Sequence, residues 1–169
     1  MKNLLIVLII ILSVISCKDF EKKDEITSIN WEKRKTTNSN FSDLIIGKTY
    51  LPIYSHIYHR FEHRTFNLTT TVSIRNVSIN DTLYLKRADY YNTNGAKIRE
   101  YLSFPVYLAP LETVEIVIEE DDIEGGSGAN FIFNWAIADE KNLPLFEAIM
   151  ISTSGQQGLS FSTRGVRID

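Results

Sequence analysis

The sequence predicts an all-β fold, packed as one sandwich or barrel. From Tyr50 onward, apolar residues recur with a period of two, which is the spacing of a strand with one buried and one solvated face. No segment in that part of the chain shows the 3.6-residue period of an amphipathic helix. Seven or eight short strands at 10–15-residue spacing favour a single sandwich, and the length of 169 residues suits one domain.

Three segments show the alternation most clearly. Residues 66–75 place one set of side chains on the face that we expect to be buried: Phe66, Leu68, Thr70, Val72 and Ile74. A second strand has its apolar face formed by Val114, Ile116 and Ile118. The third, over 131–138, is apolar on both faces, with Phe131, Phe133, Trp135 and Ile137 on one and Ile132, Ala136 and Ala138 on the other. A strand that is apolar on both faces is typical of the centre of a sheet.

Further strands are predicted at 50–58, 82–91, 97–108, 145–153 and 158–164. Asn94-Gly95 lies between two of them, and both residues tolerate the positive φ of a type I′ turn, so we expect a hairpin there. The strand order resembles an immunoglobulin-like sandwich, with a jelly roll or another antiparallel sandwich as the alternative. The Cys-Trp-Cys core of antibody domains is absent, so this resemblance concerns architecture alone.

Residues 1–16 are predicted to be a lipoprotein signal peptide. Leu4 to Leu12 form an apolar run of nine residues after the positive charge of Lys2, too short for the about 20 that a transmembrane helix needs. The segment ends in Val14-Ile15-Ser16-Cys17, which resembles the lipobox of bacterial lipoproteins, where the signal is cut before a cysteine that carries a diacylglycerol. Cys17 is the only cysteine, so lipidation leaves no thiol for catalysis. An ordinary signal peptide or an uncleaved anchor is the alternative.

Residues 17–46 are interpreted as the lipidated cysteine and a polar linker. Lys18 to Glu25 carry seven charges in eight positions, as a solvated tether does, and such tracts also resemble the surface-export signals of lipoproteins in Bacteroidetes-type bacteria. Trp31 and Phe41 are isolated apolar residues here, with a short helical turn expected near Trp31. The sandwich domain is then 47–169, in the bacterial cell envelope and anchored through the lipid to the outer membrane, on either its periplasmic or its surface side.

The charge balance argues against a nucleic-acid-binding surface. The chain has 18 Lys+Arg against 21 Asp+Glu, a formal net charge of −3, whereas phosphate recognition needs a clustered excess of Lys and Arg. The serine in residues 154–158 does not stand in a Gly-x-Ser-x-Gly nucleophile elbow. We therefore expect a non-catalytic binding or assembly module, with an envelope protein or a glycan as its partner and no cofactor.

A transition-metal site is the alternative function. Three histidines fall within eight residues and are the only ones in the chain: His56, His59 and His63. Imidazole is the commonest ligand of transition metals in proteins. On a regular strand only His59 and His63 share a face, although a turn could add His56 and Glu62 as ligands. Arg60 and Arg64 lie beside these residues and would repel a cation.

Two loops also contain residue types that ligands use. The acidic turn 119–124 offers oxygens to calcium but lacks the Asp-x-Asp-x-Asp-Gly alternation that surrounds one ion, so a solvated turn is expected. Residues 125–130 are glycine-rich but lead from strand into strand, without the helix N-terminus or the Gly-Lys-Ser/Thr of a phosphate loop. We expect there a loop that needs positive φ and a close approach of the backbone to its neighbours.

Five segments of the chain form a recognisable series. They are 50–59 (YLPIYSHIYH), 72–76 (VSIRN), 90–95 (YYNTNG), 125–131 (GGSGANF) and 156–161 (QQGLSF). In this order they resemble a bacterial family known only as a domain of unknown function, number 3124. The resemblance covers about residues 50–165. It implies an exported single-domain protein and no particular activity.

Overall fold

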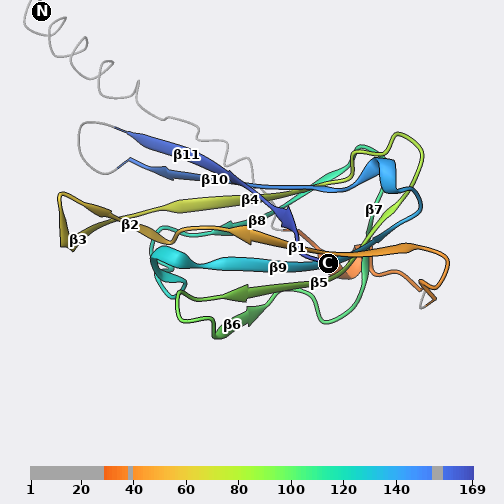
Figure 1. Cartoon of the computed structure of the whole chain (residues 1–169), viewed down its shortest axis with the longest axis horizontal. Coiled ribbons are helices and arrows are strands. Elements are labelled where there is room, and N and C mark those ends of the chain that lie inside the picture. Colours follow the sequence, from red (N-terminus) through yellow and green to blue (C-terminus); the bar gives the residue numbers. More distant parts are fainter. Residues whose placement is uncertain (1–28, 38–39, 154–157) are drawn as a thin grey trace, which may run out of the picture.

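Twelve strands and three 3₁₀ turns make up the part of the chain that the computed structural model describes, residues 29–37, 40–153 and 158–169 (Figure 1). In chain order the strands are β1 (Ile45–Pro52), β2 (His56–His59), β3 (Phe61–Asn67), β4 (Thr69–Arg75), β5 (Leu83–Tyr91), β6 (Lys97–Glu100), β7 (Val106–Leu108), β8 (Thr113–Ile118), β9 (Asn130–Ile137), β10 (Leu145–Ser152), β11 (Leu159–Arg164) and β12 (Val166–Arg167). The turns are η1 (Trp31–Arg34), η2 (Gly126–Gly128) and η3 (Glu140–Asn142). Within these ranges, no helix has the length and hydropathy needed to cross a membrane. The predicted signal peptide, Cys17 and the charged tract lie outside the described residues.

The strands form two antiparallel sheets and one separate hairpin. The larger sheet has the order β12-β1-β9-β5-β6, with β7 also paired to β5, and the smaller has the order β11-β10-β4-β8. Figure 1 shows the smaller sheet lying over the larger one. Strands β2 and β3 pair only with each other. The predicted all-β sandwich is therefore confirmed.

The apolar faces of the strands meet between the two sheets. On β4, Val72 and Ile74 are fully buried, and the apolar face of β8 is at most 4% exposed, so both alternating patterns are confirmed. A stack of rings joins the layers: the Phe133 ring of β9 lies 5.2 Å from that of Phe131 and 4.7 Å from that of Phe146 on β10. Dispersion and hydrophobic burial across this stack hold the sheets together.

Strand β9 occupies the centre of the larger sheet, between β1 and β5, as its two apolar faces predict. Trp135 is 1% exposed and its Nε1–H donates to Thr49 Oγ1 at 2.9 Å, so the one polar atom of the indole is satisfied. Gly47 on β1 lies directly against this ring, and a Cβ there would overlap it. Ala138 differs from the prediction, because β9 ends at Ile137 and Ala138 is exposed.

Three predicted strands are each divided in the structure. The segment 50–58 belongs partly to β1 and partly to β2, and the segment 97–108 forms β6 and β7, separated by residues 101–105. The segment 66–75 belongs partly to β3 and partly to β4, with a break at Leu68, which is fully buried and donates its N–H to Ser55 O at 2.9 Å. Alternation continues through these breaks, which is why the sequence pattern does not reveal them.

The predicted hairpin at Asn94-Gly95 forms, but its turn is not type I′. Type I′ requires positive φ at both central residues, whereas among these only Gly95 has it, at 76°. The loop is closed by Asn92, whose Oδ1 accepts from the backbone N–H groups of Asn94 and Ala96, each at 3.0 Å. This Asx-type capping replaces the second positive φ.

The described residues before β1 pack against the sandwich, which differs from the linker expected over 17–46. Turn η1 begins after Asn30, whose side chain accepts from Lys33 N at 3.2 Å. Its Arg34 forms an ion pair with Glu112 at 2.7 Å. Phe41 is 9% exposed and meets the Tyr84 ring edge-on at 5.5 Å. The two apolar residues that look isolated in the sequence therefore anchor this segment to the domain.

Candidate functional site

Three of the segments that carry the family resemblance meet at one end of the sandwich. Ser55 Oγ and Tyr90 Oη lie 3.0 Å apart, and both side chains are buried. Gly125 packs so closely on this pair that a Cβ there would overlap the Tyr90 hydroxyl. The next residue, Gly126, has φ 78°. The expectation that this loop needs positive φ and close backbone approach is confirmed.

Thr93 ties the glycine-rich loop to the β5–β6 hairpin. Its backbone N–H donates to Gly125 O at 2.9 Å, and its Oγ1 donates to the same oxygen at 3.1 Å. The same Oγ1 accepts from Gly128 N at 2.9 Å. The polar groups of the loop are thus used within the fold, so the geometry indicates a structural role.

Arg99 holds the acidic turn 119–124 in place. Its guanidinium donates to Asp122 Oδ2 at 2.7 Å and to Tyr101 Oη at 2.9 Å, and lies 3.3 Å from Glu124 Oε2. The hydrogen bond to Asp122 is the main cause that raises the pKa of Arg99 above its ordinary value. Burial raises the pKa of the Tyr101 hydroxyl, which therefore stays protonated at neutral pH.

The three histidines all lie on the β2–β3 hairpin, but the structure does not bring them together. The His59 ring stacks on Phe66 with 4.0 Å between ring centres, whereas His63 is exposed and its Nε2 lies 3.2 Å from Glu62 Oε1. His56 packs edge-on against Tyr58, with 6.4 Å between the rings. Among the residues that the structure describes, no group of three or more His, Cys, Asp or Glu is placed to hold a metal ion. The acidic turn 119–124 is among the described residues, so it does not form such a group either.

The electrostatics of the hairpin are unfavourable to a cation. Desolvation, followed by the charges of Arg64 and Arg60, lowers the pKa of His59 below its ordinary value. The two guanidinium groups beside this ring would also repel a metal ion.

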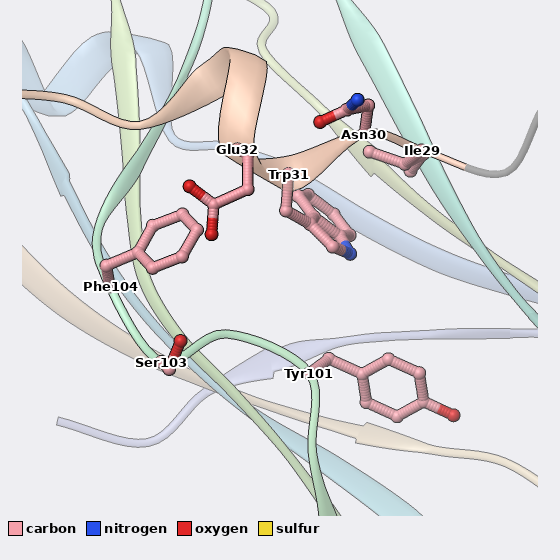
Figure 2. A pocket seen from close by; sticks show the side chains of 7 residues that line it. All are labelled: Ile29, Asn30, Trp31, Glu32, Tyr101, Ser103 and Phe104. Carbon is pink, nitrogen blue, oxygen red and sulfur yellow. The ribbon is translucent and has the colours of Figure 1, made fainter.

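A pocket lies between η1 and the segment that follows β6 (Figure 2). Its volume is about 470 Å³, within the range of small-molecule sites. Seven residues line it: Ile29, Asn30, Trp31, Glu32, Tyr101, Ser103 and Phe104. Figure 2 shows the Trp31 indole and the Glu32 carboxylate pointing from η1 toward the segment that carries Ser103 and Phe104.

Neighbouring side chains fix two of the aromatic rings of this pocket. Tyr101 contacts the core ring of Phe131 at 5.4 Å and accepts the hydrogen bond from Arg99 described above. Lys35 Nζ lies 4.7 Å from the centre of the Phe104 ring. The residues that line the pocket therefore include three partly exposed aromatic rings, the Glu32 carboxylate, the Asn30 carboxamide and the hydroxyl groups of Ser103 and Tyr101.

Comparison with known proteins places the chain in a family. Residues 46–168 match the family described as "Protein of unknown function (DUF3124)". The chain belongs to this family. The resemblance of the five segments is thereby confirmed, and the DUF3124 domain includes all twelve strands apart from the first residue of β1.

Among curated proteins, none matches the chain. A structure described as "Crystal Structure of Thermotoga maritima 1070" is similar at 10% identity and a TM-score of 0.46, over 71% of this chain and 92% of that one.

The pocket joins the DUF3124 domain to the segment that precedes it. Tyr101 and Phe104 lie within the matched range, whereas Trp31 and Glu32 lie before it. Sequence reasoning missed the site because it treats Trp31 as part of a linker and Tyr101 as one of eight tyrosines with ordinary strand packing. The available signal was the presence of a tryptophan in a polar stretch, since a ring of that size is seldom left without a packing partner.

Proposed function

We propose that this protein is a non-catalytic binding module of the bacterial cell envelope, anchored to the outer membrane by a lipid on Cys17. The support for the anchor is the sequence Val14-Ile15-Ser16-Cys17 after a short apolar run. A diacylglycerol on the cysteine supplies two acyl chains, which keep a folded domain at the membrane while leaving its surface free to bind.

The ligand proposed for the pocket beneath η1 is a sugar ring of an envelope glycan. The observation that carries this proposal is the combination of the Trp31, Tyr101 and Phe104 rings with the Glu32 carboxylate in one pocket. Aromatic faces cover the apolar C–H surface of a sugar, and a carboxylate accepts strong hydrogen bonds from its hydroxyl groups.

The same lining favours binding over hydrolysis. Most glycoside hydrolases use two carboxylic acids on either side of the bond that they cleave. Among the described residues, Glu32 is the one acidic side chain that lines this pocket, and no histidine lines it. The pocket therefore has the groups for recognition without the pair needed for cleavage.

Fluorescence tests the ligand, because the chain has two tryptophans and Trp135 is fully buried. Soluble oligosaccharides of N-acetylglucosamine and of neutral hexoses are titrated against the protein. We expect one of them to change the emission of Trp31 and to bind more weakly with Glu32→Gln. Because Trp31→Ala removes the fluorescent reporter, its affinity is measured by titration calorimetry beside the wild type, and we expect that affinity to be lost.

Tyr58→Ala serves as the matched control, since Tyr58 is an exposed aromatic residue outside the pocket. This variant should bind the sugar like the wild type. If no oligosaccharide changes the emission, or if Trp31→Ala binds as tightly as the wild type, the sugar-binding proposal is wrong.

The anchor is tested by Cys17→Ala. Metabolic labelling with a fatty acid should mark the wild type in the membrane fraction, whereas the variant should stay unlabelled or accumulate as uncut precursor. Equal labelling of the two proteins would contradict the lipid attachment.

An immunoglobulin-like strand arrangement is part of the proposal. It is supported by the pairings of β4 with β8 and of β5 with β9, which correspond to strands B–E and C–F of immunoglobulin sheets. Since β1 pairs with β9 and β10 with β4, the likeness is confined to these four strands.

A further inference from the structure

The β2–β3 hairpin leaves two large aromatic side chains in solvent. Tyr58 is 61% exposed and Phe61 is 69% exposed. Figure 1 shows the hairpin at the end of the sandwich, projecting past the neighbouring loops. Strands β2 and β3 pair with no other strand, so both edges of this ribbon are free of further sheet pairing, and all residues of β3 except Phe66 are exposed.

The base of the hairpin is nevertheless fixed. Ile57 is partly buried against the core cluster and lies opposite Phe66 on β3. His59 stacks on the same Phe66 ring. The apolar side chains near the sandwich are thus packed, whereas those at the tip are presented outward.

The tip is also cationic. It carries Arg60 and Arg64, and its one acidic side chain, Glu62, already lies 3.2 Å from His63. Among the described residues, no acidic group lies within ion-pair distance of Arg60 or Arg64. The rest of the chain carries a net negative charge, since the total is −3, so the hairpin differs in sign from the protein around it.

We propose that the tip of the β2–β3 hairpin is a membrane-contact element that binds anionic phospholipid surfaces. Tyr58 and Phe61 enter the boundary between headgroups and acyl chains, where amphipathic and aromatic rings are most stable, while Arg60 and Arg64 bind lipid phosphates. A projecting, convex tip fits a deformable bilayer, whereas a protein partner would have to supply a matching cavity. This contact is independent of the sugar pocket and would orient the domain on the membrane.

The test places a tryptophan on the hairpin of the full chain. Phe61→Trp is compared with Ile79→Trp, because Ile79 is similarly exposed at 72% and lies in the loop between β4 and β5, beyond the opposite end of β4. The proteins are added to vesicles of phosphatidylcholine, with or without phosphatidylglycerol, that contain brominated lipids as quenchers. Wild-type protein gives the contribution of Trp31 and Trp135, which is subtracted.

We expect emission from the tryptophan at position 61 to be lost in anionic vesicles, while the one at position 79 keeps its emission. Adding Arg60→Gln and Arg64→Gln to Phe61→Trp should abolish the quenching, and so should high salt. Equal quenching at both positions, no quenching at position 61, or quenching that is unchanged without phosphatidylglycerol would overturn the proposal. A hairpin that binds only a protein partner would give no quenching at position 61. Loss of sugar binding in Trp31→Ala has no bearing on this outcome.

Discussion

Trp135 on β9 and Phe61 on β3 are both aromatic residues of β-strands, yet Trp135 is 1% exposed and Phe61 is 69% exposed. The difference lies in what covers each strand. Strand β9 has a neighbour on either side and a second sheet over its inner face, whereas β3 has one neighbour and no second sheet. Residue type therefore makes burial favourable, and the packing of a second layer decides whether it occurs.

The largest expected contrast is in stability. Trp135→Ala removes a ring packed between the sheets and leaves a cavity, so it should lower the free energy of unfolding by roughly 3–5 kcal/mol. Phe61→Ser alters an exposed side chain and should change it by about 0.5 kcal/mol or less. Denaturant unfolding of both variants measures these changes in the free energy of unfolding. Similar losses would mean that the hairpin is as well packed as the interior.

A second variant probes how tightly Trp135 is enclosed. A Cβ at Gly47 would overlap the indole, so Gly47→Ala should force the ring to move and destabilise the protein by about 1–3 kcal/mol. Gly158→Ala is the matched control, because its Cβ would meet only Ser152 O at 3.9 Å. If both alanines leave the unfolding midpoint unchanged, the contact of β1 with Trp135 is looser than the structure indicates.

The turn of the β5–β6 hairpin offers a smaller effect. Gly95 has φ 76° in open space, so Gly95→Ala should cost about 1–2 kcal/mol through backbone strain alone. Asn94→Ala should cost less, since Asn94 does not have positive φ. Thermal unfolding tests whether Gly95→Ala destabilises the protein more than Asn94→Ala does. A larger destabilisation by Asn94→Ala would favour a type I′ turn.

The smallest effect is the titration of His59. Its pKa lies below 6.5 because desolvation, and then Arg64 and Arg60, disfavour the charged ring. The folded state therefore binds fewer protons, so the contribution of His59 to stability is complete above pH ~6.5 and is lost as the pH falls from there through the folded pKa. NMR titration should show a higher pKa in Arg64→Gln. An unchanged midpoint would mean that Arg64 does not act on the ring.

Much of the fold follows from local patterns. Alternation identifies the buried faces of β4 and β8, and the two apolar faces of β9 indicate its central position, because these features depend only on which side chains prefer water. The break between β3 and β4 at Leu68 is not visible in that pattern. It coincides with the hydrogen bond from Leu68 N–H to Ser55 O, and this partner is set by the path of the folded chain.

The sequence by itself determined the strand faces and the family segments, since each is a property of neighbouring residues. Only the tertiary structure decided that η1 docks on the sandwich and that Trp31 faces Tyr101 across a pocket. It also decided that the histidines diverge, because the ribbon places His59 on Phe66 and His63 beside Glu62. The physical reason is that contacts between distant segments depend on how the whole chain closes around its core, which no local preference specifies.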